Sequence, residues 1–228
     1  MHELATYDLD GPIATISMDD GKVNVFSIPM LRAVHSALDE AERDSAVVVL
    51  TGREGYFSAG FDLKTIAGGP EPLLEMLTLG ATLAERLLSF PRPVVATCTG
   101  HAYPAGAFLL LASDLRIGAD GPFRLGLNEV RIGLTVPWFA IELARHRLHP
   151  SYFDRSVVTA VMYGPHEAVN AGFLDRVVSA HELRSAGVDA AMTLAELDPA
   201  AHAATKLRAR GRALAALREA IESELVKP

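Results

Sequence analysis

Short valine-rich runs that alternate with amphipathic stretches are the feature of this sequence that most narrows its possible folds. Residues 46–51 (AVVVLT) and 93–98 (PVVATC) have the length and the apolar composition of buried strands. The stretch that follows Ser27 instead repeats apolar residues at helical spacing, and the Ser27 hydroxyl can cap its first turn. Residues 4–9 and 12–18 alternate apolar and polar side chains around a turn, which predicts a β-hairpin. Strands that alternate with helices form crossover units, so we expect an α/β protein with a mainly parallel sheet.

The composition argues against several classes of function. At 228 residues, half of them hydrophobic, the chain is long enough to bury one sizeable core. A net charge of −7 has the wrong sign for a nucleic-acid surface, which needs a basic face. Cys98 is the only cysteine, so we expect no internal disulfide and no metal site built from cysteines. No basic and then apolar leader and no apolar run of membrane-spanning length is visible, so the sequence predicts a cytoplasmic protein that does not enter a membrane.

The segment Pro104–Ala107 begins a predicted helix that continues as the apolar run Phe108–Ala112. Proline suits a first helical turn, because the amide it lacks would have no intrahelical partner there. The amides that follow are also unpaired, and the side chains of Ala105 and Gly106 are too small to cover them. Such a helix start can hold an anion, or an oxygen that becomes negative during a reaction. The alternative is a tight strand-to-helix turn that binds nothing.

Glu129 is the only carboxylate between Asp120 and Glu142, and its neighbours are mostly apolar. A carboxylate in apolar surroundings holds its proton more tightly and can act as a base near neutral pH. The alternative is an exposed residue on an amphipathic segment. Amides that stabilise an oxyanion, followed by one embedded carboxylate, indicate abstraction of a proton next to a carbonyl group.

A second strand-to-helix turn occurs earlier, in residues 52–64 (GREGYFSAGFDLK). Its small residues would let a ligand lie against the backbone, and the amide of Phe61, just after Gly60, would point at that ligand. Two such turns can supply two amide donors to one oxygen.

Three segments of the chain resemble the motifs of one superfamily. Residues 57–63 (FSAGFDL) resemble the first oxyanion loop of the crotonase (enoyl-CoA hydratase/isomerase) superfamily. Residues 100–114 resemble its second loop, and residues 164–178 resemble its later helix-strand segment. The motifs occur in the family's order and at its spacing, and the resemblance covers most of residues 4–180.

The resemblance implies a fold of repeated ββα units with a C-terminal helical region, assembled as a homotrimer or a dimer of trimers. It implies an acyl-CoA thioester as substrate, so that coenzyme A is part of the substrate and no separate cofactor or metal is expected. The thioester oxygen would be held by the backbone amides of Phe61 and Ala105, and Glu129 would be the catalytic base. The residues expected to contact the substrate or its CoA portion are Val23, Val25, Phe26, Phe57, Ala59, Gly60, Phe108 and Trp138.

One departure from the family pattern bears on the reaction. Hydratases of this family usually carry two glutamates, whereas the first of those positions is Phe108 here and only the second, Glu129, is retained. Adding water is easier with two carboxylates, but a single base can move a proton from one carbon to another. The wording of residues 102–106, 126–129 and 137–139 also resembles Δ3,Δ2-enoyl-CoA isomerases. We therefore expect an enoyl-CoA isomerase. The alternatives are an enoyl-CoA hydratase or another crotonase-type enzyme, a noncatalytic acyl-CoA-binding protein, and an unrelated α/β binding protein.

The composition changes near residue 180, after which alanine and leucine dominate. We expect a core of residues 1–180 and a C-terminal helical region of residues 181–228, with helices over 181–195 and 197–225. The basic residues of the last helix are typical of a solvated face. They are Lys206, Arg208, Arg210 and Arg212.

Other polar or aromatic residues suit ordinary structural roles. Asp62 is expected to cap a helix, Asp114 to bond to a turn, and His101 to belong to a turn near the second loop. Trp138 is expected in the core or in the wall of the acyl pocket.

Overall fold

A six-stranded sheet forms the centre of the protein, which the computed structural model describes over residues 3–226. Its first two strands form the predicted antiparallel hairpin, and the other strands are parallel to their neighbours, as expected. In spatial order the strands are β1 (Ala5–Asp10), β2 (Ile13–Met18), β4 (Val47–Thr51), β7 (Val94–Cys98), β9 (Leu115–Ala119) and β10 (Arg176–Val178).

Two small sheets stand beside this central sheet and confirm the repeated ββα pattern. In one, β3 (Val25–Phe26) pairs with β6 (Gly60–Phe61), and in the other β5 (Gly55–Ser58) pairs with β8 (Gly100–Ala102). Each repeat leaves the central sheet, adds to a small sheet, and continues into a helix. These helices are α1 (Ile28–Arg43), α2 (Leu63–Ala67) with α3 (Pro70–Ser89), and α4 (Ala105–Ala112). The small sheets therefore hold the two turns that the sequence marked as candidate oxyanion loops.

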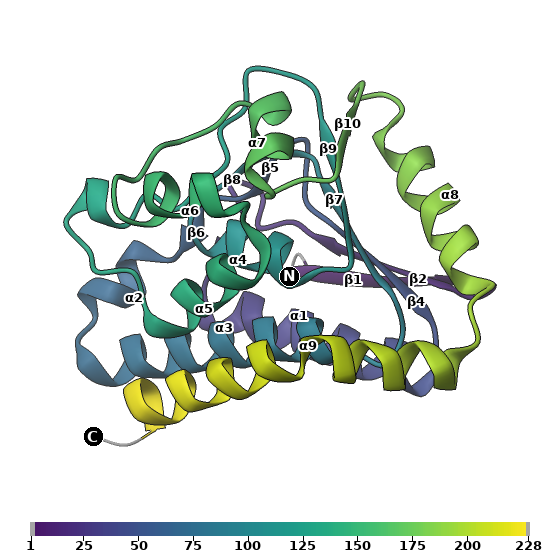
Figure 1. Cartoon of the computed structure of the whole chain (residues 1–228), viewed down its shortest axis with the longest axis horizontal. Helices are drawn as coiled ribbons and strands as arrows, with labels where there is room; N and C mark the ends of the chain where they lie inside the picture. Colours follow the sequence, from purple (N-terminus) through teal and green to yellow (C-terminus); the bar gives the residue numbers. More distant parts are fainter. Residues whose placement is uncertain (1–2, 227–228) are drawn as a thin grey trace.

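Helices cover the central sheet on both faces (Figure 1). On one face α1, α3 and α4 enclose the larger core, with α9 (Pro199–Ile221) packed against α3 and α5 (Trp138–Arg147). On the other face α8 (Leu183–Ala195) packs over β4 and β7. The remaining elements are α6 (Pro150–Val157), α7 (Pro165–Ala171), the short 3-10 helix η1 (Val130–Ile132) and the π-helical turn η2 (Glu222–Val226). Both predicted C-terminal helices are present, while the boundary at residue 180 stays a prediction, and residues 1–2 and 227–228 lie outside the described residues.

Two predicted helix caps are confirmed. The Ser27 hydroxyl accepts a hydrogen bond from the Met30 amide at 3.3 Å, at the start of α1. The Asp62 carboxylate accepts bonds from the Lys64 amide at 3.1 Å and from the Thr65 hydroxyl at 2.9 Å, at the start of α2. Asp62 is therefore occupied as a cap, as its position after the first loop indicated.

The basic face predicted for the last helix is wrong for two of its four members. Lys206 is only 6% exposed, and its Nζ lies 2.6 Å from Asp114 Oδ2. Arg210 Nη2 lies 2.7 Å from the other oxygen of the same carboxylate. Residues four apart share one helix face, so Lys206 and Arg210 point inward while Arg208 and Arg212 are exposed. Burial lowers the pKa of Lys206 to about 8.

Within residues 3–226, no helix combines the length and the apolar character that crossing a bilayer requires.

Candidate active site

The two glycine-rich turns lie backbone against backbone. The Tyr103 amide donates to the Ser58 carbonyl at 3.0 Å, which joins the second turn to the first. Gly60 has a φ of +94°, and a Cβ at this position would lie 2.4 Å from Pro104 Cδ. A Cβ on Gly106 would lie 2.8 Å from the Ser58 carbonyl oxygen. Both glycines are thus required by close approach, which brings the first turn of α4 onto the end of β5.

The backbone amides of Phe61 and Ala105 emerge from this contact. Directly after β6, the Asp62 amide donates to the Phe26 carbonyl at 3.3 Å. Only alternate residues of a strand bond to a given neighbour, so the Phe61 amide faces away from β3. Ala105 is the first residue of α4, and Pro104 before it provides no side-chain cap for the helix start. Its amide belongs to the set that a helix leaves unpaired, so both amides suit an acceptor outside the fold.

Glu129 is a buried carboxylate on the segment that runs beside the second turn. The Gly126 amide donates to the Ala102 carbonyl, and the Ala102 amide donates to the Arg124 carbonyl, each at 3.1 Å. This pairing holds Gly126, three residues before Glu129, against β8, which ends two residues before Pro104. Glu129 itself is 3% exposed, and neither of its carboxylate oxygens accepts a hydrogen bond from another of the described residues.

The environment of Glu129 changes its acidity in the direction that a base needs. Burial raises the pKa of its carboxyl group from 4.5 to about 7, because the charged form loses its hydration. A carboxylate with a pKa near 7 is present in quantity at neutral pH and binds a proton far more strongly than an ordinary glutamate does.

A cluster of three aromatic rings, Phe61, Phe108 and Phe139, occupies the position where the family resemblance places the second glutamate of a hydratase. Phe108 is buried in α4, and its ring centroid lies 6.3 Å from that of Phe61 and 5.4 Å from that of Phe139. The Phe61 side chain therefore packs beside the position where a second glutamate would stand. The structure places an apolar surface there, with no polar side chain at residue 108.

The segment expected to contact CoA lies directly against the first turn. Val25 and Phe26 pair with Gly60 and Phe61 through β3 and β6. Just before these pairs, the Ala59 amide donates to the Val23 carbonyl at 3.0 Å. The fold thus brings together the CoA candidates of both segments and the Phe61 amide. Their contacts with a substrate stay a prediction.

Trp138 is not a core residue, contrary to one of the two expectations for it. Its side chain is 61% exposed at the first position of α5. Its backbone amide donates to Glu224 Oε2 at 2.8 Å, so the end of the described chain caps this helix. A helix start preceded by Pro137 leaves the tryptophan outside the packed face, and a place in an acyl pocket stays a prediction.

His101 and Asp114 have the structural partners expected of turn residues. His101 Nδ1 accepts from the Arg124 amide at 3.0 Å. Asp114 Oδ2 accepts from the Val94 amide at 2.7 Å, in addition to its two ion pairs. Among residues 3–226 there is no group of three His, Cys, Asp or Glu side chains placed to hold a metal ion.

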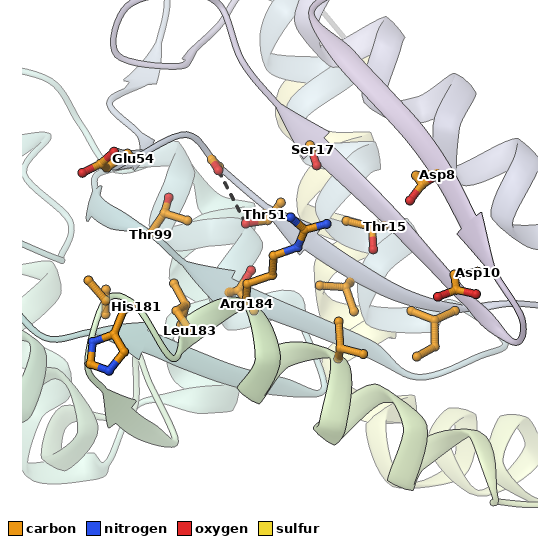
Figure 2. Close-up of a pocket in the computed structure, with 17 residues that line it drawn as sticks. Asp8, Asp10, Thr15, Ser17, Thr51, Glu54, Thr99, His181, Leu183 and Arg184 are labelled. Atoms are coloured by element: carbon orange, nitrogen blue, oxygen red, sulfur yellow. Dashed lines mark hydrogen bonds between the residues drawn. The ribbon is translucent and has the colours of Figure 1, made fainter.

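A separate cavity of about 920 Å³ lies on the face of the central sheet that α8 covers (Figure 2). Its floor is formed by hydroxyl side chains of β2, β4 and β7, including Thr15 and Thr51, and Arg184 reaches over them from α8. Neither Glu129 nor the residues of the two oxyanion turns from Phe57 to Phe61 and from Pro104 to Ala107 line this cavity.

Sequence reasoning missed Asn24 and Ser58 as organising residues of the site. Both are fully buried, and the Ser58 hydroxyl donates to the Asn24 carbonyl at 2.6 Å. Ser58 was visible only as one letter of a motif, and no pattern in the sequence connects it with a residue 34 positions earlier.

Comparisons with known proteins identify the family of the chain. A family model for enoyl-CoA hydratase/isomerase matches residues 9–226. A curated relative, the carnitinyl-CoA dehydratase of Salmonella arizonae, is 31% identical over 210 residues, which cover 90% of this chain and 80% of that protein.

Solved structures of two similar proteins extend over nearly the whole chain. An enoyl-CoA hydratase/isomerase family protein from Pseudomonas syringae is 46% identical, with a TM-score of 0.96 and coverage of 98% of this chain and 97% of that one. A Mycobacterium tuberculosis protein is 42% identical with a TM-score of 0.93. It is called a probable enoyl-CoA hydratase in one structure, where 96% of this chain and 93% of that one are covered, and an enoyl-CoA isomerase in another, where both values are 97%.

Proposed function

The chain belongs to the enoyl-CoA hydratase/isomerase family, and on this premise we propose that it moves the double bond of a 3-enoyl-CoA to the 2,3 position. The substrate is an acyl-CoA thioester, and Glu129 is the single acid-base group of the reaction. The buried, unpaired Glu129 carboxylate beside the second turn is the observation that carries this proposal.

The reaction needs one base and one oxyanion site. Glu129 removes a proton from C2, and the electron pair spreads through the double bond and onto the thioester oxygen as a dienolate. The amides of Phe61 and Ala105 donate hydrogen bonds to that oxygen as its negative charge develops. The protonated Glu129 then returns the proton to C4, which leaves the double bond between C2 and C3. No atom is gained or lost, and no second reactant is required.

The cluster of three aromatic rings at Phe108 favours isomerisation over hydration. A hydratase must hold and activate a water molecule, and a second carboxylate serves that purpose. In place of a second carboxylate, Phe108 has an aromatic ring that packs against the rings of Phe61 and Phe139. An apolar surface at this point supports a reaction in which the only proton carrier is Glu129.

The backbone beside the first turn is the proposed site of the CoA portion, which makes coenzyme A part of the substrate and requires no separate cofactor. The residues assigned to the substrate or CoA are Val23, Val25, Phe26, Phe57, Ala59, Gly60, Phe108 and Trp138. We also propose a homotrimer or a dimer of trimers.

Hydration of a 2-enoyl-CoA is the second candidate, because relatives are named as a dehydratase and as a hydratase. A paired assay separates the two reactions: a 3-enoyl-CoA and a 2-enoyl-CoA are supplied separately to the purified protein. Conjugation raises the absorbance of the first, and hydration lowers the absorbance of the second. We expect conjugation without hydration, whereas hydration at a comparable rate would overturn the isomerase assignment.

A further inference from the structure

Ser58 joins three segments of the chain at one buried point. Its hydroxyl donates to the Asn24 carbonyl at 2.6 Å and accepts from the Gly60 amide at 3.1 Å. Its own carbonyl accepts from the Tyr103 amide at 3.0 Å. Ser58 is thus bonded to the CoA-side segment, to the first turn and to the second turn at once.

The partner of the Ser58 hydroxyl is itself held in place. Asn24 is fully buried, and its φ of 53° lies in the left-handed region, which asparagine tolerates better than most residues. Its Nδ2 donates to the Met18 carbonyl at 2.8 Å, and its Oδ1 accepts from the Asp20 amide at 2.9 Å. The same Nδ2 also approaches the Phe57 carbonyl at 3.4 Å. The Asn24 carbonyl therefore presents a fixed acceptor, and the Ser58 proton has one defined direction.

The bonds of Ser58 end next to both candidate oxyanion donors. Gly60, whose amide it accepts, directly precedes Phe61, and Tyr103, whose amide its carbonyl accepts, lies two residues before Ala105. The first turn of α4 rests on the same residue, because a Cβ on Gly106 would lie 3.0 Å from Ser58 Cβ. Small shifts of Ser58 would therefore move both amides relative to each other.

We propose that Ser58 is a positioning residue that sets the spacing and direction of the Phe61 and Ala105 amides through its bonds to Asn24 and Gly60. This inference rests on the proposed function in one respect, namely that these two amides bind the thioester oxygen. Ser58 touches no reacting atom and acts only through the backbone.

The test compares two buried serines. In Ser58→Ala the Asn24 carbonyl and the Gly60 amide lose their partner. In the control, Ser113→Ala, an equally buried hydroxyl loses its 2.7 Å bond to the Leu109 carbonyl at the opposite end of α4. Both variants are expected to lose some thermal stability, because each leaves buried polar groups unpaired.

The diagnostic readout is the absorption band of an arylacryloyl-CoA, a conjugated thioester. The band moves to longer wavelength when the thioester oxygen accepts hydrogen bonds. The wild type and Ser113→Ala are expected to shift the band equally. Ser58→Ala is expected to bind the probe but to lose most of the shift. With a 3-enoyl-CoA, its kcat should fall by roughly tenfold to a hundredfold with a smaller change in KM, as displacements of about 1 Å do in enzymes. Ser58→Cys, which keeps a weak donor and acceptor, should recover part of both effects.

A full shift in folded Ser58→Ala would overturn the inference, and so would an equal loss in Ser113→Ala. If Ser58→Ala does not fold, Ser58→Cys carries the same comparison, because a thiol donates and accepts only weakly. A band shift and a kcat equal to those of the wild type in Ser58→Cys would then overturn the inference. A wild type that shifts the probe but does not isomerise a 3-enoyl-CoA would refute the proposed function alone. A wild type that does not shift the probe would refute the oxyanion assignment and with it the role of Ser58.

Discussion

The ring of Phe61 lies where a side chain at position 80 would have to be. A Cβ on Gly80 would come within 2.6 Å of both Cε1 and Cζ of that ring, closer than real Cβ contacts. Gly80 is in the middle of α3 and its φ is not in the left-handed region, so space alone explains the glycine. Helix α3 thus makes room for the side chain of the residue whose amide is the first proposed oxyanion donor.

Gly80→Ala is expected to destabilise the protein, because the added methyl forces the Phe61 ring to move. Overpacking of this kind costs about 1–3 kcal/mol in the free energy of unfolding, measured by urea denaturation. Phe61→Leu in the same background shortens the side chain and should restore part of the loss. Gly211→Ala in α9 is the matched control: its Cβ would meet nothing within 4 Å, so its helix propensity should raise stability by up to about 1 kcal/mol. Equal effects at both glycines would contradict this explanation.

Lys206→Met should be strongly destabilising, although the residue is one of four basic side chains in a repeating run. The substitution removes a buried ion pair and leaves Asp114 with only Arg210 and the Val94 amide. A hydrogen bond between charged groups contributes about 1.5–3 kcal/mol, and we expect a loss of this size because Arg210 still holds the Asp114 carboxylate. Arg208→Met on the exposed face of the same helix should stay within about 0.5 kcal/mol of the wild type. Unfolding of the two variants at the same urea concentration would contradict a structural role for the Lys206 ion pair.

The rate of isomerisation should depend on the ionisation of Glu129. Only the carboxylate form can remove a proton from C2, and burial places the pKa of this group at about 7. We expect kcat/KM to be level above that pH and to fall about tenfold for each pH unit below it. A profile that stays level down to pH 5 would contradict a base with a pKa near 7, and with it this role for the buried Glu129 carboxylate.

The same pKa makes a prediction about stability. The folded protein holds the Glu129 proton with a pKa of about 7, above the 4.5 of an unburied glutamate. The contribution of this group to stability is therefore fully present below pH 4.5 and is lost as the pH rises through 7. Glu129→Gln carries no charge, so its stability relative to the wild type should rise between pH 5 and pH 8, by roughly 3 kcal/mol at most. Urea denaturation at both pH values measures the difference, and a constant difference would mean that the carboxylate is hydrated in the folded protein.

Much of the fold and the outline of the site could be predicted from local patterns. The strand predicted at residues 46–51, the cap at Ser27 and the hairpin before it depend on neighbouring residues, and the structure confirms them, with the strand at Val47–Thr51. The two glycine-rich turns could be recognised because a close approach of two backbones requires glycine, as it does at Gly60 and Gly106.

Long-range polar contacts could not be predicted in the same way. Lys206 and Asp114 are 92 residues apart, and the sequence shows only a charge run on one side and a turn residue on the other. The exposure of Trp138 depends on which face of α5 packs against the core, and the bond that Glu224 accepts from its backbone amide also joins distant segments. Each of these depends on which helix faces which, and that is decided by the packing of the whole core.

The most direct measurement follows conversion of a 3-enoyl-CoA by Glu129→Gln and by the wild type under single-turnover conditions. Glutamine has nearly the same size and cannot accept the C2 proton, while the amides of Phe61 and Ala105 remain. We predict that the variant binds the acyl-CoA as the wild type does and that its turnover falls by several orders of magnitude, on the scale of about a thousandfold or more. Near-normal turnover in the folded variant would show that Glu129 is not the base, because the proton would then have to move without it.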